Sequence, residues 1–128
     1  MAVAAMLAPI GCSIGADEEP KPVTGVAKEI AATVDQLERA VARRDYATIC
    51  NELFTKTARE RAGGGECVSQ LRSAGEDVLR PTIQIERIAV KDDRAVVRVA
   101  TMAKGQARVS DSLELRRTGG NWLIEALS

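Results

Sequence analysis

Histidine is absent from the 128 residues, and aromatic side chains make up only 2% of them. Without histidine, His-based acid/base catalysis, Cys-His and Ser-His nucleophiles and the commonest zinc ligand are excluded. The scarcity of aromatic rings argues against a platform for stacking nucleic-acid bases. Lys plus Arg and Asp plus Glu both number 18, so the formal net charge is zero and bulk charge does not favour nucleic-acid binding. We therefore expect no catalytic set, no metal site, no cofactor and no nucleic-acid partner.

The remaining composition is that of an ordinary soluble domain. Hydrophobic residues are 45% of the chain and charged residues 28%. A chain of this length can bury one hydrophobic core, so a single domain is expected.

The N-terminal segment, residues 1–16, contains no charged side chain. Its apolar part is far shorter than the roughly 20 residues that span a bilayer, and it fits the hydrophobic region of a signal peptide. The run Pro9-Ile10-Gly11-Cys12 resembles a bacterial lipoprotein signal, which implies that Cys12 is lipid-modified. The alternative is an unmodified thiol. The polar, proline-bearing residues 17–22 are typical of a tether, so we divide the chain into 1–22, signal and tether, and 23–128, the folded domain.

Helical periodicity dominates the first part of that domain. Apolar residues recur at helical spacing over residues 24–44, with Thr24 as the expected cap, which predicts a long amphipathic helix. Asp45 is expected to cap a second helix over 46–54, and Thr55 or Thr57 a further turn ending near residue 62. A triple glycine at 63–65 then breaks the helix before a third one over 66–74.

Strand patterns fill the rest of the chain. We expect four strands, over residues 82–91, 94–102, 106–117 and 122–127, joined by short turns. The apolar parity of the first strand changes midway, which predicts a bulge near Glu86 and Arg87. Helices followed by an antiparallel meander indicate an α+β fold, with the N-terminal helices packed on a curved, four-stranded antiparallel sheet.

Two cysteines, Cys50 and Cys67, lie close together in the helical part. A disulfide between them would close a loop of roughly 15–20 residues and stabilise the fold by about 3 kcal/mol. Such a bond is expected if the protein is exported. The alternative is a pair of buried, reduced thiols.

Three segments carry a family resemblance that covers about residues 23–127. They are Arg44-Asp45-Tyr46-Ala47-Thr48-Ile49-Cys50, the run Gly63-Gly64-Gly65-Glu66-Cys67, and the end of the chain from Leu113 through Trp122 to Glu125. In this order they resemble the nuclear transport factor 2-like superfamily, whose cone-like fold wraps a curved sheet around a long helix. They are similar in particular to small exported lipoproteins of high-GC Gram-positive bacteria. The superfamily includes isomerases, cyclases and non-catalytic binding domains, and its fold alone does not choose among them.

Three residues are candidates for ligand contact. Asp111 shares the parity of the apolar residues in its strand; a carboxylate in an apolar pocket would have a raised pKa and could act as a general base. A structural role near a sheet edge is the alternative for Asp111. Tyr46 could line the mouth of the cone or pack between helices. Trp122 could contact a ligand or pack in the core.

The leading hypothesis is a non-enzymatic, exported or lipid-anchored domain at the extracytoplasmic face of the cell membrane. It would bind a small apolar ligand or an envelope protein, with Cys12 as its membrane anchor. One alternative is a small isomerase or cyclase that uses Asp111 as its base. Another is a structural module that forms a homodimer through its sheet, which an exposed apolar sheet face would favour.

Overall fold

The computed structural model describes residues 25–128. The expected signal, the tether, Cys12 and the cap at Thr24 lie outside the described residues. No helix among residues 25–128 is long and apolar enough to cross a membrane.

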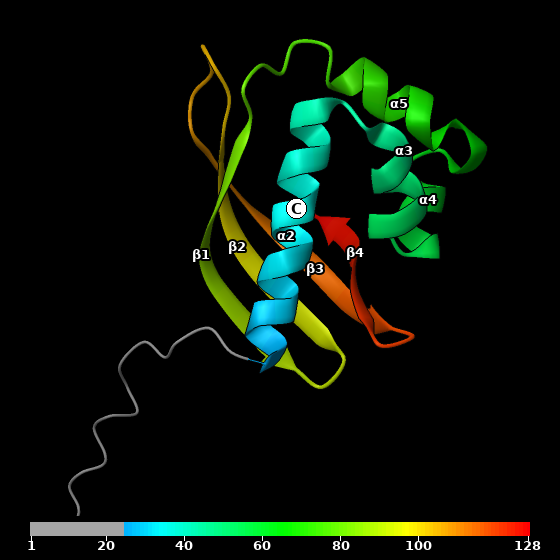
Figure 1. Cartoon of the computed structure of the whole chain (residues 1–128), viewed down its shortest axis with the longest axis vertical. Coiled ribbons are helices and arrows are strands. Elements are labelled where there is room, and N and C mark those ends of the chain that lie inside the picture. Colours follow the sequence, from blue (N-terminus) through cyan, green and yellow to red (C-terminus); the bar gives the residue numbers. More distant parts are fainter. Residues whose placement is uncertain (1–24) are drawn as a thin grey trace, which may run out of the picture.

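Helices precede a four-stranded sheet, as the sequence predicts. The long helix α2 spans Gly25–Arg43, and five short helical segments follow it. They are α3 (Tyr46–Thr48), the π-helical turn η3 (Ile49–Leu53), α4 (Lys56–Arg61), and the 3-10 turn η4 (Gly64–Glu66) leading into α5 (Cys67–Ala74). The strands are β1 (Thr82–Lys91), β2 (Arg94–Met102), β3 (Val109–Thr118) and β4 (Asn121–Leu127). Figure 1 shows α2 lying over one face of the sheet, with α3, α4 and α5 grouped beside it.

The sheet is an antiparallel meander in the order β1-β2-β3-β4. Ile85 pairs with Val99 but Arg87 pairs with Arg98, so Glu86 is an extra residue in β1 and the expected bulge is confirmed. Bulges bend a strand and increase its twist, which lets the sheet curve around α2.

The core lies between α2 and the inner face of the sheet. Ile30 and Val34 of α2 are fully or almost fully buried against alternate residues of the central strands, such as Val97 and Leu115. This contact explains why apolar residues recur every three to four residues in α2 and every second residue in the strands. Each element turns one apolar face away from water.

The helix caps follow the sequence closely. Asp45 accepts a hydrogen bond from the Thr48 amide at 3.2 Å. Of the two threonines proposed for the next cap, Thr55 is the one used, because its hydroxyl accepts a hydrogen bond from the Ala58 amide at 3.0 Å.

Two element boundaries differ from the prediction by more than a residue. The helix expected over 46–54 changes at Ile49 to a π-helical turn, where the Phe54 amide donates to the Ile49 carbonyl at 3.0 Å. Phe54 then becomes extended and forms a bridge with Ile124 of β4. The third strand begins at Val109 rather than at residue 106, because Gln106 donates to the Ala103 carbonyl in a turn.

Candidate functional site

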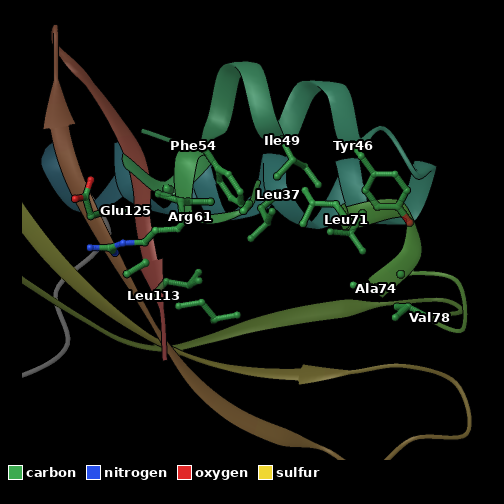
Figure 2. Close-up of a pocket in the computed structure, with 17 residues that line it drawn as sticks. Leu37, Tyr46, Ile49, Phe54, Arg61, Leu71, Ala74, Val78, Leu113 and Glu125 are labelled. Atoms are coloured by element: carbon green, nitrogen blue, oxygen red, sulfur yellow. The ribbon is translucent and has the colours of Figure 1, made fainter. Parts of the chain in front are cut away.

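A pocket of about 610 Å³ lies between the helices and the C-terminal strand. Its wall is predominantly apolar and takes side chains from α2, η3, α5, β3 and β4 (Figure 2). Representative wall residues are Leu37, Val41, Ile49, Phe54, Leu71 and Leu113. Pockets of 300–1,000 Å³ with mainly hydrophobic linings are typical of small-molecule sites.

The helical segments supply one side of this pocket because each has apolar residues beyond those needed for the core. Leu37 and Val41 lie in the last turns of α2 and are only partly buried. The π-helical turn allows Ile49 to be buried while Phe54 continues as extended chain toward β4. Leu71 of α5 faces the same space.

The few polar groups of the wall lie near its ends. Figure 2 shows Arg61 and Glu125 at one end of the pocket and Tyr46 and Val78 at the other. Glu125 has no cross-strand partner, because Ala126 pairs with Glu114 and Ile124 pairs with Leu115. A second bulge, in β4, therefore brings Glu125 to the pocket although simple alternation along the strand would not.

Tyr46 is buried, with 5% of its surface exposed, and it is part of the pocket wall. Its hydroxyl lies so close to Gly75 that any side chain at position 75 would overlap with it. Tyr46 thus belongs both to the pocket wall and to the hydrophobic core, and contact with a ligand stays a prediction.

The loop at the Tyr46 end is held by Arg44. The Arg44 guanidinium donates to the Gly75 carbonyl at 3.2 Å and to the Val78 carbonyl at 3.3 Å. Arg44 also terminates α2 in the left-handed conformation, with φ of 58°, a position that usually takes glycine. One residue thus ends the helix and fixes a loop that closes the pocket.

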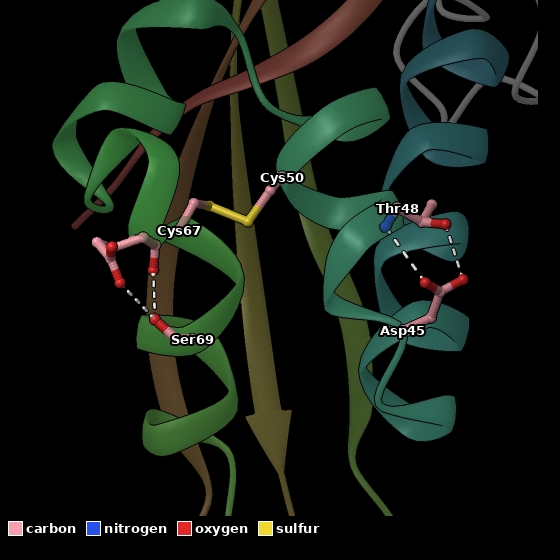
Figure 3. Close-up of a disulfide and its surroundings, with 6 residues drawn as sticks. Asp45, Thr48, Cys50, Cys67 and Ser69 are labelled. Carbon is pink, nitrogen blue, oxygen red and sulfur yellow. Dashed lines mark hydrogen bonds between the residues drawn. A yellow bond between two sulfur atoms is a disulfide. The ribbon is translucent and has the colours of Figure 1, made fainter.

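A disulfide joins Cys50 to Cys67, the pair expected from the sequence (Figure 3). The two Cα atoms are 6.1 Å apart, and both residues are almost fully buried. The bond ties η3 to the start of α5, and both elements contribute to the pocket wall.

Asp111 is not among the residues that line this pocket. It lies in β3 opposite Val99 and is partly exposed. The general-base proposal requires Asp111 in the wall of an enclosed cavity, and this placement gives it no support. Its apolar parity reflects a position at the margin of the buried core, between buried Leu113 and exposed Val109.

Trp122 does not line this pocket either. It is buried with 3% exposure, its backbone carbonyl accepts a hydrogen bond from the Thr33 hydroxyl at 2.9 Å, and the Arg117 guanidinium carbon lies 6.0 Å from its ring centroid. Trp122 also borders a separate, more polar hollow of about 450 Å³. The packing role considered for Trp122 therefore fits the structure better than contact with a ligand in the main pocket.

Sequence reasoning missed Arg61, Glu125 and the loop around Gly75. Arg61 ends α4 two residues before the triple glycine, and its sequence neighbours do not mark it as part of a pocket wall. Within residues 25–128 no cluster of three or more acidic, cysteine or histidine side chains could hold a metal ion.

A scan of protein-family models finds no match to the chain, and a search of curated proteins finds none either. Solved structures, in contrast, share its fold. An NTF2-like protein of unknown function from Silicibacter pomeroyi DSS-3 is 20% identical, with 81% of this chain and 96% of that chain covered and a TM-score of 0.61. An NTF2-like protein of unknown function from Shewanella baltica OS155 is 19% identical, with coverage of 82% and 98% and a TM-score of 0.55.

The de novo designed NTF2 fold protein NT-9 is 13% identical, with 77% of this chain and 83% of that chain covered and a TM-score of 0.55. The chain therefore has the NTF2-like cone fold, as its sequence resemblance implied. Identities this low establish the fold and not the function.

Proposed function

We propose that this protein is a non-enzymatic binding domain that holds a small apolar ligand in the pocket between its helices and β4. The observation that carries the proposal is the pocket itself, about 610 Å³ with a mainly apolar wall inside a disulfide-linked fold. Burying an apolar ligand there gains roughly 25 cal/mol for each Å² of apolar surface removed from water.

The charged groups of the wall lie at one end only, which favours an elongated ligand with one strongly polar end. Arg61 and Glu125 lie at the same end of the pocket, where they could hydrogen-bond a head group (Figure 2). The opposite end is formed by Tyr46, Gly75 and Val78. A chain-like amphiphile would place its apolar part along Leu37, Ile49 and Leu71.

An exported, membrane-anchored location is part of the proposal. It rests on the resemblance of residues 9–12 to a lipoprotein signal and on the disulfide, because disulfides persist mainly in oxidising compartments. Mass spectrometry of the native protein tests it. A chain that begins at an acylated Cys12 is expected, and an unmodified chain that begins at Met1 in the cytosol would rule it out.

Ligand binding is tested by filling the pocket. Ala74 is an exposed residue of α5 that lines the pocket, and Ala42 is an exposed residue of α2 that does not. Ala74→Trp should weaken binding of a fluorescent fatty-acid probe at least tenfold, the effect of about 1.4 kcal/mol. Ala42→Trp should bind as the wild type does.

The probe titration needs two companion measurements. Thermal unfolding shows whether each tryptophan variant is folded. Native mass spectrometry of the wild type shows whether an apolar molecule is retained from the cell. If the wild type binds no probe, or if both variants bind it equally well, the pocket is not the binding site.

A further inference from the structure

The outer face of the sheet, which points away from α2, carries a group of basic side chains. In the register of the strands, Arg94 lies opposite Lys91 on one side and opposite Arg116 on the other. Arg98 follows Arg94 by four residues in β2 and lies opposite Arg87 of β1. Directly opposed residues of antiparallel strands project from the same face, so these five side chains share one surface, named here the basic face.

Burial shows which face this is. Ala95, Val97 and Val99 alternate with the basic residues of β2 and are at most 2% exposed, because they face the helices. Arg94 and Arg98 are exposed. The basic face is therefore the outer side of the sheet, opposite to the side that holds the pocket.

Like charges directly opposite one another in a sheet are destabilising. Among residues 25–128 the ion pairs are Arg39–Asp35 and Arg108–Glu86, so no side chain of the basic face takes part in one. Glu114 shares this face and lies opposite Val96, and Glu125 borders the same hollow as Arg94 and Arg116. The chain has no net charge, yet this surface carries five basic side chains and fewer carboxylates. An external anion would relieve this repulsion.

An apolar residue lies in the middle of the charges. Val96, between Arg94 and Arg98, is 46% exposed. At about 3.4 Å per residue, the two arginines are roughly 14 Å apart, which is too wide for one phosphate group to bridge. A hollow of only about 90 Å³ lies beside Arg94 and Arg116, and its wall also contains Glu114 and Glu125. The basic face thus has basic side chains on both sides of one exposed apolar residue.

We propose that the basic face docks on a membrane that contains anionic phospholipid. Arginine matches the geometry of phosphate oxygens, and an anionic leaflet attracts each nearby basic side chain. Val96 would reach the boundary between head groups and acyl chains. A second copy of the chain fits the face poorly, because a two-fold interface would set these arginines against one another. The inference does not depend on the pocket or on acylation of Cys12.

Vesicle flotation with the full chain tests this docking. All proteins carry Cys12→Ser, so that no acyl group or thiol at that position contributes. The protein with an unchanged basic face should float with phosphatidylcholine vesicles that contain phosphatidylglycerol. It should float much less with vesicles of pure phosphatidylcholine. Binding should weaken as salt is raised, since exposed charges are screened beyond about 10 Å at 0.1 M salt.

Paired variants localise the effect. Arg94→Gln combined with Arg98→Gln should lower the partition coefficient by about fivefold for each arginine. The matched control, Arg59→Gln with Arg72→Gln, removes the same charge from exposed positions of α4 and α5 and should bind normally. Thermal unfolding of every variant verifies that it is folded, and removal of opposed arginines should leave the melting temperature unchanged or higher.

Four results would overturn the proposal. These are equal binding to both kinds of vesicle, normal binding by the Arg94/Arg98 variant, an equal loss in the helix control, and preferential binding of polyglutamate over vesicles. The last would identify the partner as an acidic polypeptide. Sedimentation equilibrium can give a fifth contradicting result. If the wild type is a dimer and the Arg94/Arg98 variant is a monomer, the basic face is a homodimer interface instead.

Discussion

At the scale of single residues, Gly75 has a steric role rather than a conformational one. Its φ is −95°, a value that any residue can adopt, but a Cβ atom there would overlap with the Tyr46 hydroxyl. Tyr46 is buried in the pocket wall and has little room to move. The glycine therefore sets the shape of one pocket end by letting the tyrosine ring approach the backbone.

Gly75→Ala should destabilise the protein by about 1–3 kcal/mol, the usual cost of overpacking a buried site. Tyr46→Phe removes the overlapping hydroxyl, so the double variant should regain most of that loss. Urea unfolding of the two single variants and the double variant measures the coupling between the residues. Equal effects of Gly75→Ala with and without the hydroxyl would contradict the contact.

Arg44 combines two functions that a substitution can separate. Its backbone is left-handed, which costs a non-glycine residue roughly 1–2 kcal/mol, while its side chain holds the carbonyl groups of Gly75 and Val78. Arg44→Gly relieves the backbone strain and removes the side-chain hydrogen bonds. We expect a variant of near wild-type stability whose loop at residues 75–78 is less ordered.

The readout for Arg44→Gly is probe affinity measured beside unfolding free energy. A several-fold weaker affinity at unchanged stability is expected, because the pocket end is less preorganised. Arg43→Ala is the control, since Arg43 is exposed and does not line this pocket. Unchanged affinity in Arg44→Gly would mean that the loop does not shape the binding site.

At the scale of elements, the disulfide is the strongest constraint on the short helices. These helices have between three and eight residues, too few to be stable alone. The bond between Cys50 and Cys67 fixes η3 against α5 across a sequence separation of 17 residues. It therefore stabilises the part of the fold that forms the pocket wall.

Reduction, or Cys50→Ala with Cys67→Ala, should lower the free energy of unfolding by about 3 kcal/mol. Probe affinity should fall as well, because Leu71 and Ala74 of α5 lose their fixed position. In non-reducing alkylation, Cys50 and Cys67 should remain unlabelled while Cys12 reacts if it is not acylated. A melting temperature that reductant does not change would contradict a structural role for this bond.

Local signals were enough to predict most elements. Alternation placed β1 and β2 at their observed ends, and the parity change within β1 revealed the bulge at Glu86. The second bulge could not be predicted, because Trp122, Ile124 and Ala126 alternate normally and the shift comes from pairing with β3. For the same reason, the position of Glu125 in the pocket became visible only in the folded chain.

The candidate residues show the same limit. Parity correctly grouped Asp111 with the inward residues of its strand, but parity does not say where along a strand the core ends. The core covers Leu113 and Leu115 and leaves Val109 exposed, so Asp111 lies at its margin. Pocket walls combine residues from segments far apart in the sequence, and no local pattern reports that they meet.

At the scale of the whole molecule, the sheet separates two surfaces. The pocket lies on the side of the helices, and the basic face lies on the other side. A domain docked through its basic face would leave the helical side, with Tyr46 and Arg61, turned away from the membrane. A ligand could then enter or leave while the protein remains bound.

The N-terminal segment would add a second attachment to the one proposed for the basic face. Thirteen positions separate Cys12 from Gly25, a span of at most about 45 Å when extended. That reach lets an anchor at Cys12 and the basic face contact one membrane together. Two attachments joined by a short linker bind far more tightly than either alone.

We therefore predict that the two attachments act together in an exporting bacterium. Arg94→Gln with Arg98→Gln should leave an acylated protein in the membrane fraction but with its domain more accessible to added protease. Cys12→Ser alone should release most of the protein at high salt, because only the salt-sensitive contact of the basic face remains. Removing both should release it at low salt as well.

Fractionation with mass spectrometry of the N-terminus measures each state. Release that depends on Cys12 alone, with the same protease sensitivity in every arginine variant, would show that the sheet does not touch the membrane and that the anchor acts by itself.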